Sequence, residues 1–322
     1  MTTFKEIRGT AIQVVSSDPA NPIEGQIWYN SSSGTLKGSQ YSETWSAGGN
    51  MNTARDFAGA FGTQTASLIF GAQTPVTITT TESYNGTSWT AVNSLNNAVA
   101  QSRGVGIQTA GLSIGGYEGP PGQNTNRTES WNGTSWTATG NYIGSIASIY
   151  AFGTQTAAIG AGGYQGPAYV NSTASWSGSS WTSLPATISS NRGYGGSAGT
   201  QTAGLIFTGQ EAPGKTTVTQ SWNGTSWTTL PATMNTGRSA LGYAGIQTAA
   251  LGFGGYSTAV SAATEIWNGT SWRSTTNLPT AFETVAGSGT SASALSAGGT
   301  PPVTTSSNEW NAGLLTKTVT VS

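Results

Sequence analysis

Short stretches of alternating apolar and polar residues recur along this chain, and each is followed by a turn rich in Gly, Asn or Ser. The most regular stretch places two aromatic residues five positions apart around a polar turn, as in WNGTSW at residues 131–136. It occurs at residues 84–89, 131–136, 176–181, 222–227 and 267–272. Alternation over so few residues predicts β-strands, Asn-Gly predicts a hairpin turn, and a period of about 45 residues predicts a repeat architecture.

A second motif, Gly-x-Gln-Thr-Ala, lies between the hairpins. It starts at Gly62 and recurs at residues 106–110, 153–157, 199–203 and 245–249, with a degraded copy at 289–293. A short apolar run and usually a pair of glycines follow it. The sequence therefore predicts six units of four strands each: one strand before this turn, one between it and the glycine pair, and two around the Asn-Gly turn.

The paired tryptophans indicate how these units pack. A two-residue loop at Asn132 and Gly133 would place Glu129 opposite Trp136, and strand alternation would put Trp131 and Trp136 on the same side of the sheet. Two indoles on one face need a neighbouring sheet to cover them, and each burial stabilises the fold by about 1.5–3 kcal/mol or more. An all-β fold, a six-bladed β-propeller, is the predicted arrangement.

The ends of the series predict how the ring closes. Trp310 has no partner five residues later, and Trp45 precedes the series without a third-strand aromatic. We expect residues 43–46 to pair beside residues 309–311 as a velcro closure. The two tight turns would share one rim, and the variable loops would lie on the other, at residues 116–128, 163–174, 209–219 and 255–264. This divides the chain into an arm with a short hairpin at residues 1–40 and a propeller at residues 41–322.

Composition narrows the function classes. Charged residues make up 7% of the chain and the net charge is −1, which argues against nucleic-acid binding. Cys and His are absent, which removes thiolate chemistry and the commonest general base and metal ligand, so no metal or cofactor is predicted. No apolar run is long enough for membrane insertion, and the first residues do not resemble a signal peptide.

Three arginines carry a resemblance to a known repeat family. Arg55, Arg192 and Arg238 stand seven residues before the turn glycine, ahead of the glycine pair and the tryptophans. This pattern resembles the kelch repeat over residues 43–311, although Val99, Ile146 and Phe282 occupy the same position in the other units. The resemblance implies a six-bladed propeller in which each Arg forms hydrogen bonds between blades. The alternative is a basic cluster near the channel, like that of sialidases.

The N-terminal segment carries a second resemblance. Residues 24–38, EGQIWYNSSSGTLKG, resemble a short hairpin of bacteriophage virion proteins, and the whole repeat pattern is similar to tail-fibre-like proteins of marine phages. The resemblance implies a virion protein on the surface of an extracellular particle. The arm would dock to other virion proteins through the apolar side chains of Phe4, Ile7, Ile12, Val14 and Val15.

Candidate binding residues lie in the variable loops. Tyr117, Tyr164 and Tyr256 follow the glycine pair at equivalent positions, where their rings could stack on sugars or pack the loops against the ring. The variable loops contain few charged residues, among them Glu118, Arg127 and Glu211. These side chains could orient a ligand, or they could simply be exposed to solvent.

Three functions follow from these features. The leading hypothesis is a tail fibre or appendage whose loop face binds a host-surface glycan. The second is a capsid or tail decoration protein without a receptor role. A polysaccharide-acting enzyme is disfavoured, because Asp18 and Asp56 are the only aspartates and the recurring Glu82, Glu129 and Glu265 are scattered around the ring. No catalytic residue is predicted, and a homo-oligomer is left open.

Overall fold

The computed structural model describes residues 12–119 and 122–319, which form strands and turns. Within these residues no helix is long and apolar enough to cross a membrane. The chain divides into a larger unit, Trp45–Trp310, and a smaller unit made of Met1–Thr44 and Asn311–Ser322. The structure thus groups the C-terminal residues with the N-terminal arm, whereas the sequence-based division placed them with the propeller.

Five antiparallel four-stranded sheets make up most of the larger unit, and each has its strands in sequence order. The first contains β4 (Gly59–Gly62), β5 (Ser67–Phe70), β6 (Thr81–Tyr84) and β7 (Trp89–Val92). The second contains β8 (Arg103–Ile107), β9 (Ala110–Glu118), β10 (Gln123–Trp131) and β11 (Trp136–Ala138). The third contains β12 (Tyr150–Gly153), β13 (Ala158–Ala161), β14 (Thr173–Trp176) and β15 (Trp181–Leu184).

The fourth and fifth sheets follow the same plan. The fourth contains β17 (Gly196–Thr200), β18 (Ala203–Phe207), β20 (Thr219–Trp222) and β21 (Trp227–Thr229), with a two-stranded ribbon of β16 (Arg192–Gly193) and β19 (Gln210–Glu211). The fifth contains β22 (Gly242–Ile246), β23 (Ala249–Phe253), β24 (Thr264–Trp267) and β25 (Trp272–Thr275). A further sheet contains β26 (Ala286–Gly289), β27 (Ser293–Ala297), β28 (Ser307–Thr318) and β3 (Thr35–Ala47). In this sheet β26 pairs with β27, β27 with β28, and β28 with β3.

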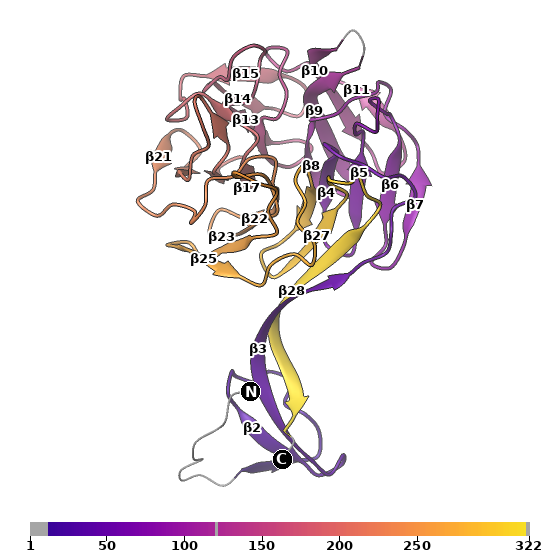
Figure 1. Ribbon diagram of the computed structural model, residues 1–322, viewed down its shortest axis with the longest axis vertical. Coiled ribbons are helices and arrows are strands. Elements are labelled where there is room, and N and C mark those ends of the chain that lie inside the picture. Colours follow the sequence, from indigo (N-terminus) through magenta and orange to yellow (C-terminus); the bar gives the residue numbers. More distant parts are fainter. Residues whose placement is uncertain (1–11, 120–121, 320–322) are drawn as a thin grey trace. The chain divides into compact units, whose positions relative to one another are not determined.

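The first strands of these sheets contact one another in a closed cycle. β4, β8, β12, β17, β22 and β26 each contact the next, and β26 contacts β4 (Figure 1). The residue two positions before each of these strands has a left-handed φ of 52–61°. Its backbone N–H donates a hydrogen bond to the carbonyl of the corresponding residue before the preceding first strand. These residues are Phe57, Gln101, Ser148, Tyr194, Ala240 and Thr284, and the cycle closes because Phe57 donates to Thr284. The fold is therefore all-β and propeller-like.

The aromatic hairpins have a different register from the predicted one. Trp131 lies opposite Trp136, and Glu129 lies opposite Ala138, so the loop has four residues and the two-residue prediction is wrong. The reason is the Asn132 side chain, whose Oδ1 accepts hydrogen bonds from the two backbone N–H groups of residues 134 and 135, at 2.9 and 2.8 Å. The two indoles still share one side of the sheet, with ring centroids 5.3 Å apart.

Neighbouring sheets cover these indoles, as predicted. The Trp136 indole packs against Phe61 and Phe70 of the preceding sheet and donates to the hydroxyl of Thr81, at 3.1 Å. The same bond recurs in four other places: Trp181 to Thr128, Trp227 to Thr173, Trp272 to Thr219, and Trp45 to Thr264. These contacts bury large aromatic side chains between the sheets, as part of the core.

The glutamine of the Gly-x-Gln-Thr turn adds a second contact between sheets. The Gln201 amide donates to the carbonyl of Trp176 in the preceding sheet, at 2.6 Å, and Gln247 donates to that of Trp222, at 2.7 Å. Within each sheet this turn lies beside the hairpin turn. In the fourth sheet, for example, Gly224 of the hairpin turn is so close to Thr202 that a Cβ on it would contact that residue. The two tight turns therefore share one rim, as the spacing predicts.

The smaller unit contains β1 (Gln13–Val15), β2 (Ile27–Asn30) and parts of β3 and β28. The Asp18 carboxylate accepts hydrogen bonds from Lys37, Asn30 and the buried Trp28, at 2.7, 2.8 and 3.0 Å. These bonds, that of Lys37 foremost, lower the pKa of Asp18 to about 2. Several large apolar side chains are exposed: Ile12, Val14, Ile23, Tyr29, Tyr41, Leu314 and Leu315. Of the predicted docking residues, Phe4 and Ile7 lie outside the described part of the chain.

Candidate functional site

The variable loops lie beside the connections that lead into each sheet. Backbone bridges join Tyr117 to Ala100, Tyr164 to Ala147, and Tyr256 to Ser239. The three predicted tyrosines thus occupy equivalent places at the end of the second strand, on the rim away from the tight turns. Their surroundings differ, and these differences decide which ring a ligand can reach.

Two of the tyrosines are engaged by side chains of the protein itself. The Tyr164 ring lies 5.3 Å from that of Tyr169, which in turn lies 6.4 Å from that of Tyr194. The Lys215 ammonium lies 4.7 Å from the centre of the Tyr256 ring. Tyr117 instead lines an open hollow of about 240 Å³ together with Pro75, Val76 and Thr77.

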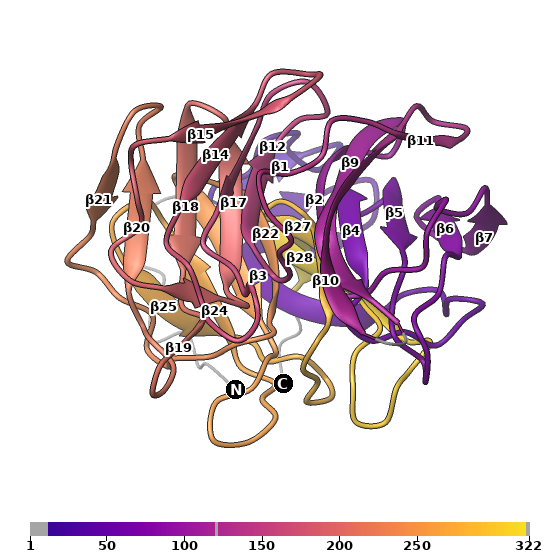
Figure 2. The ribbon, with the colours of Figure 1, turned by 90° about the horizontal axis from the view of Figure 1, so that it is seen from above.

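A hollow along the second sheet brings two predicted residues together. β9 and β10 are nine residues long, and Figure 2 shows them beside the shorter β4 and β5. Their pairing is interrupted by a bulge between Thr125 and Thr128. Glu118 of β9 and Arg127 of β10 form an ion pair at the edge of a hollow of about 360 Å³.

Five side-chain amides line part of this hollow. They belong to Asn97, Gln123, Asn124, Asn126 and Asn141. A primary amide both donates and accepts hydrogen bonds, as a sugar hydroxyl does. Asn124 also donates to the carbonyl of Tyr164, at 2.7 Å, so the hollow lies beside the loop that follows β13 of the third sheet.

The hollow also contains a residue that the sequence analysis did not select, Glu129. Its side chain is 4% exposed, and its carboxylate accepts hydrogen bonds from the backbone and side chain of Asn96, at 3.0 and 2.6 Å, and from the backbone of Asn97, at 3.3 Å. A signal was present in the sequence, because Val99 stands where other units have the arginine that pairs with this acid.

Glu211 lies away from this group. It belongs to the ribbon of the fourth sheet, opposite Arg192, and its carboxylate accepts a hydrogen bond from the Ser190 hydroxyl, at 2.6 Å. It does not line the hollow that contains Glu118 and Arg127. Of the six predicted binding residues, the structure therefore brings only Glu118 and Arg127 together. The other four lie at separate places on the molecule.

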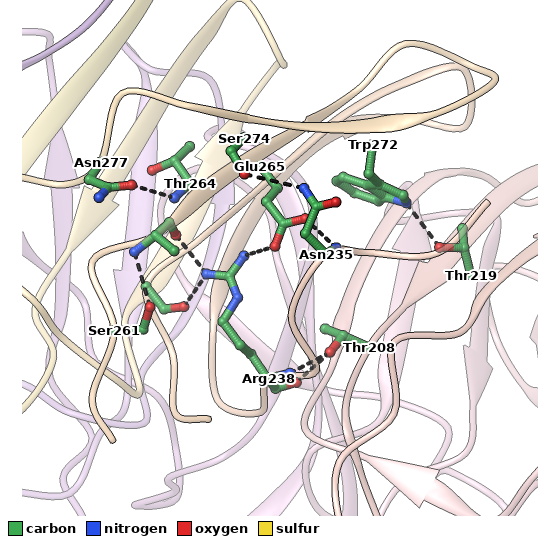
Figure 3. Close-up of polar contacts among 12 residues, drawn as sticks. Thr208, Thr219, Asn235, Arg238, Ser261, Thr264, Glu265, Trp272, Ser274 and Asn277 are labelled. Carbon is green, nitrogen blue, oxygen red and sulfur yellow. Dashed lines mark hydrogen bonds and ion pairs between the residues drawn. The ribbon is translucent and has the colours of Figure 1, made fainter. Parts of the chain in front are cut away.

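The three repeated arginines are buried within the fold. Arg238 has no exposed surface, and its guanidinium donates to the carbonyls of Gly254 and Ala263 and to the carboxylate of Glu265 (Figure 3). Its backbone exchanges hydrogen bonds with the hydroxyl of Thr208 in the preceding sheet. Arg55 and Arg192 are equally buried, so the basic cluster considered from the sequence is wrong, and Arg238 links two sheets.

Two further carboxyl groups lie next to the hydrogen-bonded cycle. Asp56 and Glu283 precede Phe57 and Thr284, and loss of solvent raises the pKa of both. The charge of Glu283 raises the pKa of Asp56 further, whereas Lys215 opposes the shift at Glu283. Among the described residues, no group of three or more His, Cys, Asp or Glu side chains could hold a metal ion.

Comparison with protein-family models and with curated proteins gives no match for this chain.

Proposed function

We propose that the larger unit is a kelch-like six-bladed propeller closed by β3. The closed cycle of six first strands supports six blades. Trp45 of β3 donates to Thr264 at 3.2 Å and lies 5.4 Å from the Trp310 ring, the contacts that a fourth-strand tryptophan makes in other sheets. Trp45 would thus complete the blade of β26, β27 and β28. An experimental density map with seven blades would refute the proposal.

We propose that the protein is a phage virion component, a tail fibre or appendage, that binds a host-surface glycan without turnover. The amide-lined hollow beside Glu118 and Arg127 carries this proposal, because it is open, polar and large enough for a sugar ring. Within the described residues, the side chains of Asn126 and Asn141 have no hydrogen-bond partner of their own. They are therefore available to the hydroxyl groups of a ligand.

The smaller unit would hold the protein on the particle. Its exposed side chains, such as Val14 at 66% and Ile23 at 70%, suit contact with other virion proteins. Deletion of residues 1–25, or the milder pair Val14→Ser and Ile23→Ser, should reduce incorporation into virions. Unchanged incorporation of both variants would contradict the docking role.

Adsorption competition tests the receptor role. Purified protein, added to the host before infection with its own virus, should block adsorption in a dose-dependent manner. The double variant Asn126→Ala and Asn141→Ala should block poorly, whereas Tyr256→Ala, which changes a ring already engaged by Lys215, should block like the wild type. Release of reducing ends from purified host glycan would contradict binding without turnover.

A decoration role is the second candidate. It is favoured by the internal contacts of Tyr164 and Tyr256, which leave two of the three rim tyrosines packed against the protein's own side chains. No block by folded protein, including a multivalent form, would favour this candidate over receptor binding.

A further inference from the structure

A buried arginine fills the same slot in the first and fifth sheets. Arg55 donates through Nη1 to the carbonyls of Gly71 and Thr80, both at 2.8 Å, and through Nη2 to Glu82, at 2.8 Å. Arg238 donates to the equivalent carbonyls, both at 2.6 Å, and to Glu265, at 3.0 Å (Figure 3). Two carbonyl oxygens and one carboxylate thus define the arginine slot.

The second sheet keeps the acceptors of this slot but has Val99 in place of the arginine. The carbonyl of Val99 accepts a backbone bond from Ala72, just as the carbonyl of Arg55 does from Gly299. The acceptors equivalent to those of Arg55 are the carbonyls of Gly115 and Arg127 and the carboxylate of Glu129.

The third and last sheets have lost both the acid and the arginine, and the fourth has lost only the acid. The third sheet has Ile146 with Ala174, the last has Phe282 with Asn308, and the fourth retains Arg192 with an uncharged Gln220. Among the described residues, the second sheet alone retains the acid after losing the cation. This asymmetry singles out Glu129.

Glu129 is nearly inaccessible to bulk water, yet its hydrogen-bond donors among the described residues are neutral groups of Asn96 and Asn97. Among the described residues, no Lys or Arg forms an ion pair with it, and the nearby Arg127 is paired with Glu118. A buried carboxylate without a counter-ion is unfavourable, so the site has an intrinsic preference for a cationic group.

A small hollow lies at the slot in this sheet and shares lining residues with the amide-lined hollow. Val99, Gly115, Arg127 and Glu129 line this small hollow of about 10 Å³, close to the volume that one water molecule requires. Asn97, Glu118, Thr125, Arg127 and Glu129 line both this hollow and the larger one of about 360 Å³. A group bound in the slot can therefore belong to a ligand whose remaining atoms lie in the larger hollow.

We propose that the arginine slot of the second sheet binds the protonated primary amine of an amino sugar. An ammonium group is about the size of water and has three N–H donors, which match the carbonyls of Gly115 and Arg127 and the carboxylate of Glu129. The sugar hydroxyls would contact the amides of Asn126 and Asn141. The inference rests on the proposed glycan-binding role of the same hollow and specifies its ligand class.

Calorimetric titration with glucosamine, N-acetylglucosamine and glucose tests this inference. Glucosamine should bind the wild type at least about tenfold more tightly than the two uncharged sugars, a factor that corresponds to about 1.4 kcal/mol. Val99→Arg places a guanidinium in the slot, as in Arg55 and Arg238, and should abolish this preference. Glu129→Gln should also abolish it, whereas Glu211→Gln, outside the hollow, should leave it unchanged.

A measurement on the unaltered protein covers the case in which these variants fail to fold. Glucosamine should shift the amide signals of Asn96 and Asn97 in the ¹⁵N spectrum of the wild type. Absent shifts, or equal binding of the three sugars, would overturn the inference. Equal binding together with blocked adsorption would leave the glycan proposal standing, and no sugar binding together with no block would overturn both.

Discussion

The pair of Arg238 and Glu265 offers a quantitative test of how the sheets are joined. Glu265→Ala would leave the guanidinium of Arg238, which has no exposed surface, without its counter-ion. Arg238→Ile would leave the carboxylate of Glu265 with the backbone N–H of Asn235, at 2.7 Å, but without a cation. Removal of one partner of a buried ion pair costs about 3–5 kcal/mol.

The double variant Arg238→Ile and Glu265→Ala should behave differently. It reproduces the pair Ile146 and Ala174, with which the third sheet fills the same two positions. The carbonyl of Ala263 would still accept the backbone bond from Gly254, at 3.0 Å. The double variant should therefore lose no more stability than either single variant, which gives a coupling energy of about 3 kcal/mol or more.

Urea unfolding followed by tryptophan fluorescence would measure the free energies of unfolding of the wild type and the three variants. Thermal melts should agree, with losses on the order of 10 °C for each single variant. Additive losses, in which the double variant is destabilised by the sum of the singles, would refute the reasoning. Such additivity would mean that the two charges contribute independently and that apolar replacement does not relieve the site.

Three further predictions concern other parts of the chain. The pKa of Asp18 is lowered from 3.8 to about 2, so its stabilising effect is complete above about pH 4 and is lost as the pH falls toward 2; Trp28 fluorescence should follow this window in the wild type and not in Asp18→Asn. Gly245→Ala would place a Cβ 2.3 Å from a carbonyl oxygen of its own turn at a φ of +120°, and should cost about 1–3 kcal/mol in unfolding free energy, whereas Gly214→Ala meets no atom within 4 Å and should be nearly neutral. Gln247→Met removes a hydrogen bond between sheets and should cost about 1–3 kcal/mol in the same assay, because a backbone acceptor loses its partner; an unchanged free energy would show that water replaces the amide.

The sequence by itself determined the strands and their grouping into units, because both depend on residues that are close together along the chain. The repeated aromatic pairs and the Gly-x-Gln-Thr turns predicted four strands in each unit, because strand alternation and turn formation depend on residues a few positions apart. The same pattern predicted that Trp136 needs a neighbouring sheet, since an indole is too large and apolar to be left in water. The length of the hairpin loop was not predicted correctly from the sequence, because hydrogen bonds to the Asn132 side chain stabilise a four-residue loop in place of the predicted two-residue loop.

Only the tertiary structure determined which charged residues meet and which have no partner of opposite charge. Glu118 and Arg127 were selected from the sequence as separate loop charges, and the fold placed them on adjacent strands beside the same hollow. Glu129 was recognised as a repeated acid, but its lack of a cationic partner depends on Val99, which lies in the connection before the sheet. Charge pairing and burial are properties of three-dimensional neighbours, so the sequence gives the residue types, and the packing of the sheets decides which charges are neutralised and which remain available to a ligand.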